Sequence, residues 1–127
     1  AHPKSNLIPE MPPWRELVID WNDLHHMPRA WRAALAQWRG IYLITDRSSG
    51  EQYVGSAYGD KNILSRWDAY ASSGHGGNLE LRGREPSGFQ FSILERLSPD
   101  SSPHDVIARE NSWKTRLATR EFGMNRN

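Results

Sequence analysis

Residues 40–55 read GIYLITDRSSGEQYVG, and this stretch decides the fold class. Residues 40–45 are rich in β-branched and aromatic side chains, residues 46–50 are turn formers, and residues 51–55 form a second short run. Two such runs on either side of a turn are typical of a β-hairpin. The sequence therefore predicts two antiparallel strands joined by a tight turn.

The length of the hairpin loop determines which residues face each other. If the loop consists of the four residues 46–49, Tyr42 lies directly opposite Tyr53, and both phenols lie on one face of the sheet. A five-residue loop would place them on opposite faces. Either tyrosine taken alone is more simply interpreted as an ordinary residue of a half-buried strand.

Before and after the hairpin, apolar residues recur at helical spacing. Residues 29–37 are rich in alanine and follow Pro28, which predicts a short helix leading into the first strand. Residues 60–72 predict a second helix, with Asp60 as its cap and an apolar stripe that should pack on the sheet. That stripe consists of Ile63, Leu64, Trp67 and Ala71.

The second half of the chain predicts one more strand and one more long helix. A short helical piece is expected near residues 78–82, and alternating apolar residues at 89, 91 and 93 predict a third strand. Ser102 and Pro103 are typical of a helix start, so the last helix should run to about Ala118. We therefore predict an α/β (α+β) fold with a three-stranded antiparallel sheet flanked by helices.

The chain of 127 residues has the length of one compact domain. Residues 28–127 should form that domain, and the proline-rich residues 1–27 should form an arm or linker of uncertain structure. The absence of cysteine excludes disulfides, thiolate zinc sites and cysteine nucleophiles, and suits a cytoplasmic protein. The net charge of +1 neither requires nor excludes a polyanionic partner, and no apolar run is long enough to span a membrane.

Glu110 is the most informative single position. Val106, Glu110, Trp113 and Leu117 are spaced four, three and four residues apart, so a carboxylate occupies a position where the helical period calls for an apolar side chain. A buried charge without a partner is expensive, so this residue needs a cation, a basic side chain or a metal ion. An ion pair with Lys114 and a metal site are equally good interpretations of the periodicity.

Arg66 and Tyr70 are four residues apart on the predicted helix 60–72, so they project side by side next to its apolar stripe. Taken alone, the arginine is more simply a solvated or salt-bridging residue. Together with Glu110 and the hairpin phenols, however, it completes the set of groups that cleavage of a nucleic-acid backbone needs. The carboxylate would hold a divalent ion, the arginine would offset phosphate charge, and the phenols would position or deprotonate water.

These residues also resemble the GIY-YIG nuclease family over most of the chain, from about Trp38 to Asn125. Residues 40–42 match the first namesake motif, and residues 53–55 match the second with valine in place of isoleucine. The resemblance implies a three-stranded antiparallel sheet flanked by helices, with one Mg²⁺ or Mn²⁺ ion at the site. The site residues that follow the motifs at family-like distances are Arg66, Glu110 and Asn125.

The resemblance also implies a role for each site residue. Glu110 would be the sole protein ligand of the metal ion, and Tyr42 or Tyr53 would activate the attacking water. Arg66 would stabilise the developing phosphate charge. Asn125 would support the site from near the end of the chain.

Two positions depart from the commonest family pattern, and two more residues are weaker candidates. Many members carry histidine four residues after the arginine, where this chain, like the repair-type members, has Tyr70. Ser56 stands where some members have a lysine. His75, in a glycine-rich loop, is a candidate for contacting the phosphate, although most loop histidines are merely solvated. Lys114 is a second candidate for contacting the substrate.

We expect a metal-dependent endonuclease that hydrolyses DNA phosphodiester bonds with one Mg²⁺ or Mn²⁺ ion. The chain begins without methionine, so we expect the catalytic module of a larger protein, with recognition left to a fused or separate targeting domain. Two alternatives stay open. One is a catalytically inactive DNA-binding or protein-interaction module that retains the fold. The other is a regulatory domain in which the N-terminal arm and helix cover the active face and are moved by a partner.

Overall fold

An antiparallel sheet of four strands, in the order β1-β4-β2-β3, lies at the centre of the molecule. This computed structural model describes residues 10–127. The strands are β1 (Val18–Asp20), β2 (Arg39–Asp46), β3 (Gln52–Ala57) and β4 (Phe89–Leu97). The mixed fold is as predicted, but the count of three strands is wrong. The fourth strand, β1, comes from the segment predicted as an arm, and its three residues are too few to show an alternating pattern.

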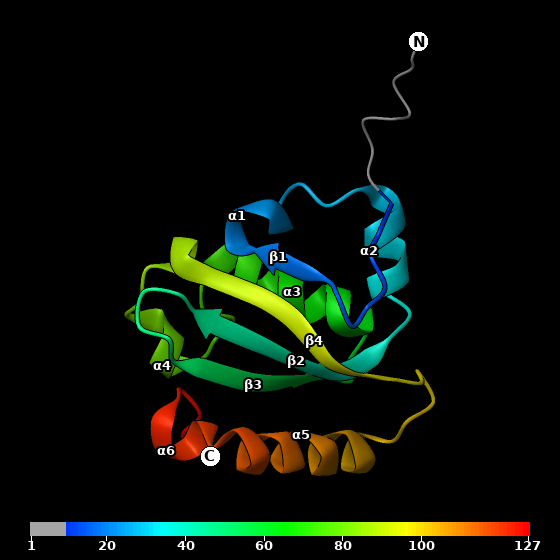
Figure 1. Ribbon diagram of the computed structural model, residues 1–127. Helices are drawn as coiled ribbons and strands as arrows, with labels where there is room; N and C mark the ends of the chain where they lie inside the picture. Colours follow the sequence, from blue (N-terminus) through cyan, green and yellow to red (C-terminus); the bar gives the residue numbers. More distant parts are fainter. Residues whose placement is uncertain (1–9) are drawn as a thin grey trace.

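Helices cover both faces of the sheet (Figure 1). They are α1 (Trp21–Leu24), α2 (Arg29–Leu35), α3 (Asn62–Ser73), α4 (Leu79–Arg82), α5 (Pro103–Leu117) and α6 (Thr119–Phe122), with a 3₁₀ turn at Pro86–Gly88. Helices α1, α2 and α3 pack together on one face, and α5 packs against β2 and β3 from the other. Asp60 does not cap α3 as predicted, because the chain turns through a left-handed residue at Lys61 before the helix begins.

The hairpin of β2 and β3 has a register that differs from the predicted one. Tyr42 pairs with Gly55 and Ile44 pairs with Tyr53, so the four-residue loop is 47–50 rather than 46–49. Tyr42 therefore does not lie directly opposite Tyr53, as it would with a loop of residues 46–49. Because the shift is two residues, the two phenols still lie on the same face of the sheet.

Asp46 is the physical reason for this register. Its backbone N–H donates to the Glu51 carbonyl over 2.9 Å, so it closes the β2–β3 ladder instead of opening the loop. Its side chain accepts hydrogen bonds from the Ser48 N–H (3.0 Å) and hydroxyl (2.6 Å) and forms an ion pair of 3.0 Å with Arg84. Burial opposes ionisation of this carboxylate, but these partners outweigh it and lower its pKa.

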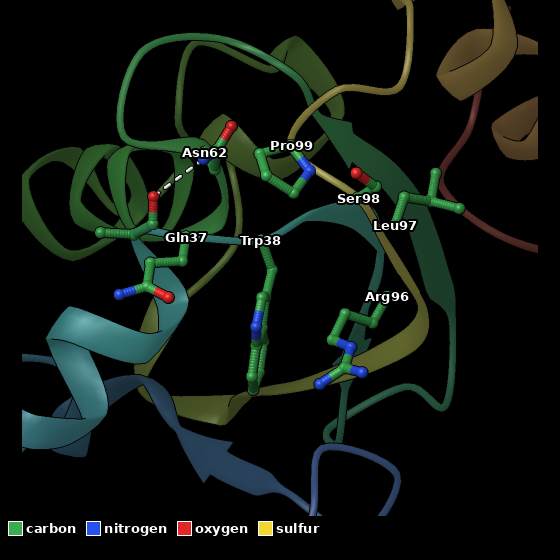
Figure 2. A pocket seen from close by; sticks show the side chains of 8 residues that line it. Gln37, Trp38, Asn62, Arg96, Leu97, Ser98 and Pro99 are labelled. Atoms are coloured by element: carbon green, nitrogen blue, oxygen red, sulfur yellow. Dashed lines mark hydrogen bonds between the residues drawn. The ribbon is translucent and has the colours of Figure 1, made fainter.

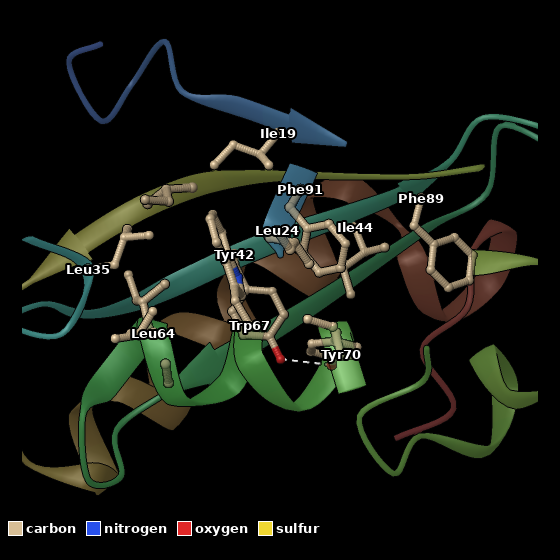
Figure 3. Packing of buried hydrophobic residues seen from close by; sticks show 14 of the residues in the cluster. Ile19, Leu24, Leu35, Tyr42, Ile44, Leu64, Trp67, Tyr70, Phe89 and Phe91 are labelled. Carbon is tan, nitrogen blue, oxygen red and sulfur yellow. Dashed lines mark hydrogen bonds between the residues drawn. The ribbon is translucent and has the colours of Figure 1, made fainter. Parts of the chain in front are cut away.

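Two hydrophobic cores lie on the two faces of the sheet. Figure 3 shows the larger core, in which Tyr42, Trp67, Tyr70 and Phe91 are all fully buried. The smaller core, under α5, is built around Ile41, Val54 and Val106. Burying a large apolar side chain is worth about 1.5–3 kcal/mol, so the larger core contributes most of the stability.

The last helix follows its predicted stripe only in part. Val106 is buried, but Leu117 is 37% exposed because α5 ends there and Ala118 adopts a left-handed conformation. Lys114 is buried in its place. A stripe read from helical spacing holds only as far as the helix continues.

Both glycines of the hairpin motifs allow a close approach between strands. A Cβ atom at Gly40 would overlap the carbonyl oxygen of Glu95 on β4, beside the irregularity in the β2–β4 ladder at Ile41 and Tyr42. A Cβ atom at Gly55 would overlap the phenol of Tyr42. The side chain of Tyr42 therefore crosses β3 at the one residue that leaves room for it.

The C-terminal segment lies along the outer edge of β3. The Met124 N–H donates to the Gln52 carbonyl over 2.8 Å. The side chain of Asn125, fully buried, accepts from the Val54 N–H (2.9 Å) and donates to the Val54 carbonyl (3.0 Å). Asn125 therefore replaces a neighbouring strand for this residue of β3. Across residues 10–127, none of the helices combines the length and the apolar character that membrane crossing requires.

Candidate active site

A pocket of about 360 Å³ lies beside β3, the edge strand of the sheet. Because β3 is an edge strand, α3 on one face and α5 on the other can both reach past it. Each contributes one charged side chain, Arg66 and Glu110 respectively. The complete lining is Tyr42, Tyr53, Ser56, Tyr58, Gly59, Arg66 and Glu110.

A cluster of two buried phenols and a guanidinium lies at the pocket; Tyr42 and Arg66 line it, and Tyr70 lies outside the lining. The hydroxyls of Tyr42 and Tyr70 are 2.9 Å apart (Figure 3), and the Arg66 Nη2 donates to Tyr70 over 3.3 Å and to Tyr42 over a longer 3.5 Å. Burial raises the pKa of Tyr42 to about 12 and that of Tyr70 well above its usual value. Both phenols are therefore neutral near pH 7, where they orient the arginine.

Tyr53 stands in a different environment from Tyr42. It is only partly buried and lines the pocket. Its hydroxyl makes no hydrogen bond to any other residue in the described part of the chain, 10–127. Of the two hairpin phenols, Tyr53 is therefore the one free to meet a water molecule in the pocket.

Glu110 turns inward from α5, as the helical period predicts, and its side chain is 14% exposed. The Ser56 hydroxyl donates to its Oε1 over 2.5 Å, and the Lys114 ammonium lies 2.9 Å from its Oε2. The ion pair that competed with a metal site in the sequence interpretation is thus formed. The contact from Ser56 was not predicted, although strand alternation from Val54 places it on the face that α5 covers.

The remaining candidates lie outside the pocket lining. Asn125 is occupied with the backbone of Val54, so it supports β3 rather than reaching the pocket. His75 accepts the Gly77 N–H at its Nδ1 over 2.8 Å and so shapes its own loop. Lys114 is only 2% exposed, and its ammonium contacts Glu110 and Asn127; its contact with substrate stays a prediction.

Glu110 is the pocket residue best suited to hold a divalent metal ion. Among residues 10–127, no three His, Asp or Glu side chains converge, so the chain builds no closed metal cage there. Mg²⁺ commonly binds through one or two carboxylates while keeping several water molecules and adding substrate phosphates. One inward carboxylate beside hydroxyl groups and open volume fits this mode of binding.

A larger pocket, of about 720 Å³, lies at the N-terminal end of α3 (Figure 2). Its lining includes Trp38 and Arg96, whose guanidinium carbon lies 5.0 Å from the centre of the indole ring. No carboxylate, histidine or phenol lines it. The candidate active site is therefore the smaller pocket, which carries the phenols, the arginine and the carboxylate.

Comparisons with known proteins identify a family and two similar structures. The profile of the GIY-YIG catalytic domain matches residues 39–125. Two solved structures of the catalytic domain of the intron (homing) endonuclease I-TevI are similar. A mutant form is 26% identical, with a TM-score of 0.57, covering 71% of this chain and 94% of that one. The second is 28% identical, with a TM-score of 0.54, covering 68% and 96%. A search of the curated proteins found no match.

Proposed function

Because this chain belongs to the GIY-YIG nuclease family, we propose that it is a metal-dependent endonuclease that hydrolyses DNA phosphodiester bonds. The observation that carries the proposal is the meeting of Tyr53, Arg66 and Glu110, from three different elements, around one pocket. We propose that the chain acts as the catalytic module of a larger protein, because the pocket offers groups for cleavage and few groups for recognising a base sequence.

The role proposed for Glu110 is to hold one Mg²⁺ or Mn²⁺ ion at the pocket. Such an ion, when bound, would supply positive charge for the scissile phosphate and lower the pKa of water. The Ser56 hydroxyl fixes the carboxylate at its Oε1 and so keeps it directed at the pocket. A fixed ligand makes a small site with one carboxylate more effective.

The proposed roles of the other residues follow from their surroundings. Arg66, oriented by Tyr42 and Tyr70, would offset charge that develops on the phosphate. Tyr53 would position the attacking water and, as its phenolate, accept a proton from that water, because its hydroxyl, unlike that of Tyr42, has no hydrogen-bond partner among residues 10–127. Tyr42, with its pKa of about 12, would serve to hold the arginine.

Nicking of supercoiled plasmid in the presence of Mg²⁺ or Mn²⁺ tests this function. Glu110→Ala and Arg66→Ala should each lower the nicking rate by about 100-fold or more, the effect of losing a group that stabilises transition-state charge. Arg29→Ala is the matched control, because Arg29 is exposed on α2 and outside the pocket. Cleavage that survives a chelator, or that persists in Glu110→Ala, would contradict the proposal.

A second candidate is a DNA-binding module without turnover. The observation in its favour is that both oxygens of Glu110 already have partners, a hydrogen bond from Ser56 and an ion pair with Lys114, while burial keeps Tyr42 protonated. It predicts DNA binding in a gel-shift assay that is unchanged by a chelator, with intact plasmid after long incubation in Mn²⁺. Metal-dependent nicking would exclude it.

A further inference from the structure

Lys114 is the least exposed charged residue among residues 10–127. Its side chain is 2% exposed, although an ammonium group is costly to bury without partners. Its partners are the Glu110 Oε2 at 2.9 Å and the Asn127 Oδ1 at 3.0 Å. A lysine at this position of a helix could reach solvent, so its burial against the carboxylate needs an explanation.

The charges around the pocket supply that explanation. Arg66 and Glu110 are the charged residues of the pocket lining, and the ammonium of Lys114, which is outside the lining, lies 2.9 Å from the Glu110 Oε2. Two positive groups therefore act on a pocket that holds one negative group. A divalent cation that approaches Glu110 in the absence of DNA meets a carboxylate already neutralised by an ammonium, whereas a phosphate meets net positive charge.

On the basis of the proposed function, we propose that Lys114 makes binding of the divalent metal depend on DNA. The ammonium acts as a resident counter-ion that holds Glu110 in place and weakens its affinity for a metal ion. A DNA phosphate in the pocket restores the missing negative charge and adds an oxygen ligand, so the ion binds firmly only then. Lys114 acts through Glu110 and is a positioning residue, not a catalytic one.

Binding of Mn²⁺ alone, followed by electron paramagnetic resonance without DNA, tests this inference directly. Lys114→Gln keeps a hydrogen-bond donor but removes the charge, and should raise the affinity for Mn²⁺ by about ten-fold or more. Lys114→Arg keeps the charge and should retain the weak binding of the unmodified protein. Arg29→Gln removes an exposed charge far from the pocket and should change nothing.

Glu110→Gln identifies the site, because it should abolish the Mn²⁺ binding gained in Lys114→Gln. Unchanged or weaker binding in Lys114→Gln, or a gain that survives Glu110→Gln, overturns the inference. The result does not depend on cleavage: tighter binding at Glu110 in a protein that never nicks DNA would uphold this inference while the proposed function fails.

A second measurement keeps the test decisive if Lys114→Gln does not fold. Tyr53→Phe, which should leave DNA intact, is titrated with Mn²⁺ in the presence and absence of a short DNA duplex. The duplex should raise the affinity for Mn²⁺ by about ten-fold or more beyond what the duplex binds by itself. The same increase in the Tyr53→Phe, Glu110→Gln double variant, or no increase in either protein, overturns the inference.

Discussion

Tyr42 and Tyr53 are the same kind of side chain in different surroundings. They lie on one face of one hairpin, yet Tyr42 is fully buried and hydrogen-bonded to Tyr70. The Tyr53 hydroxyl faces the pocket and has no hydrogen-bond partner among residues 10–127. Gly55 has no side chain, which leaves the space on β3 that the Tyr42 ring occupies. The same residue type therefore has two roles in this hairpin: Tyr42 is structural, and Tyr53 faces the pocket.

Phenylalanine substitutions separate these roles. Tyr53→Phe should lower the nicking rate by about 100-fold and change the free energy of unfolding by less than about 1 kcal/mol, because no hydrogen bond within the protein is lost. Tyr42→Phe should cost about 1 kcal/mol of stability and lower the rate less, because Arg66 keeps its contact with Tyr70. Nicking rates and urea denaturation measure both effects. The reverse order of rates would assign the proton acceptor to Tyr42.

At the scale of the elements, the sequence predicts which strands and helices are present better than it predicts where each of them begins and ends. The hairpin, α3, α5 and the inward Glu110 follow from alternating or helical spacing, which depends on many residues at once. The loop boundary depends on one residue, Asp46, which joins the ladder because Ser48 and Arg84 bind its side chain. Such a partner on a distant element cannot be read from local composition. For the same reason, the contact between Ser56 and Glu110 could not be predicted from the sequence.

Asp46 also gives the hairpin a dependence on pH. Its pKa is lowered in the fold, so its contribution to stability is present above the ordinary aspartate pKa of about 4 and is lost as the pH falls through the lowered value. Asp46→Asn should reduce the free energy of unfolding by about 1–3 kcal/mol at neutral pH, because a hydrogen-bonded charge is lost.

Urea denaturation near pH 7 and near pH 3 checks this dependence. The difference between Asp46→Asn and the unmodified protein should shrink at the lower pH. Asp100→Asn, a change at an exposed residue, should show no such trend. A difference that stays constant with pH would mean that the charge of Asp46 does not stabilise the hairpin.

For the whole molecule, the N-terminal segment belongs to the core. Leu17, Ile19, Leu24 and Met27 are buried, and the Trp21 indole donates to the Tyr70 carbonyl over 2.8 Å. None of residues 10–27 lines the active-site pocket. The alternative of an arm that covers the active face therefore finds no support in residues 10–27, and residues 1–9 lie outside the described structure.

Two truncations distinguish a core segment from a regulatory one. Removal of residues 1–27 deletes four buried side chains, worth about 1.5–3 kcal/mol each, and should leave a protein that is unfolded or aggregated at room temperature. Removal of residues 1–9 deletes none of them and serves as the control. Circular dichroism and thermal melting measure the outcome. A shortened protein of residues 28–127 that melts cooperatively near the original temperature would refute the assignment of β1 and α1 to the core.

The tail that runs beside β3 has a consequence for how copies of this protein coexist. An exposed sheet margin has unpaired backbone N–H and C=O groups, which can pair with a strand of another molecule and lead to aggregation. Here the C-terminal segment forms hydrogen bonds with that margin: the Met124 N–H binds the Gln52 carbonyl, and the Asn125 carboxamide binds both backbone groups of Val54. Loss of the last few residues would thus make a monomer prone to edge-to-edge association with other copies, under conditions in which its core stays folded.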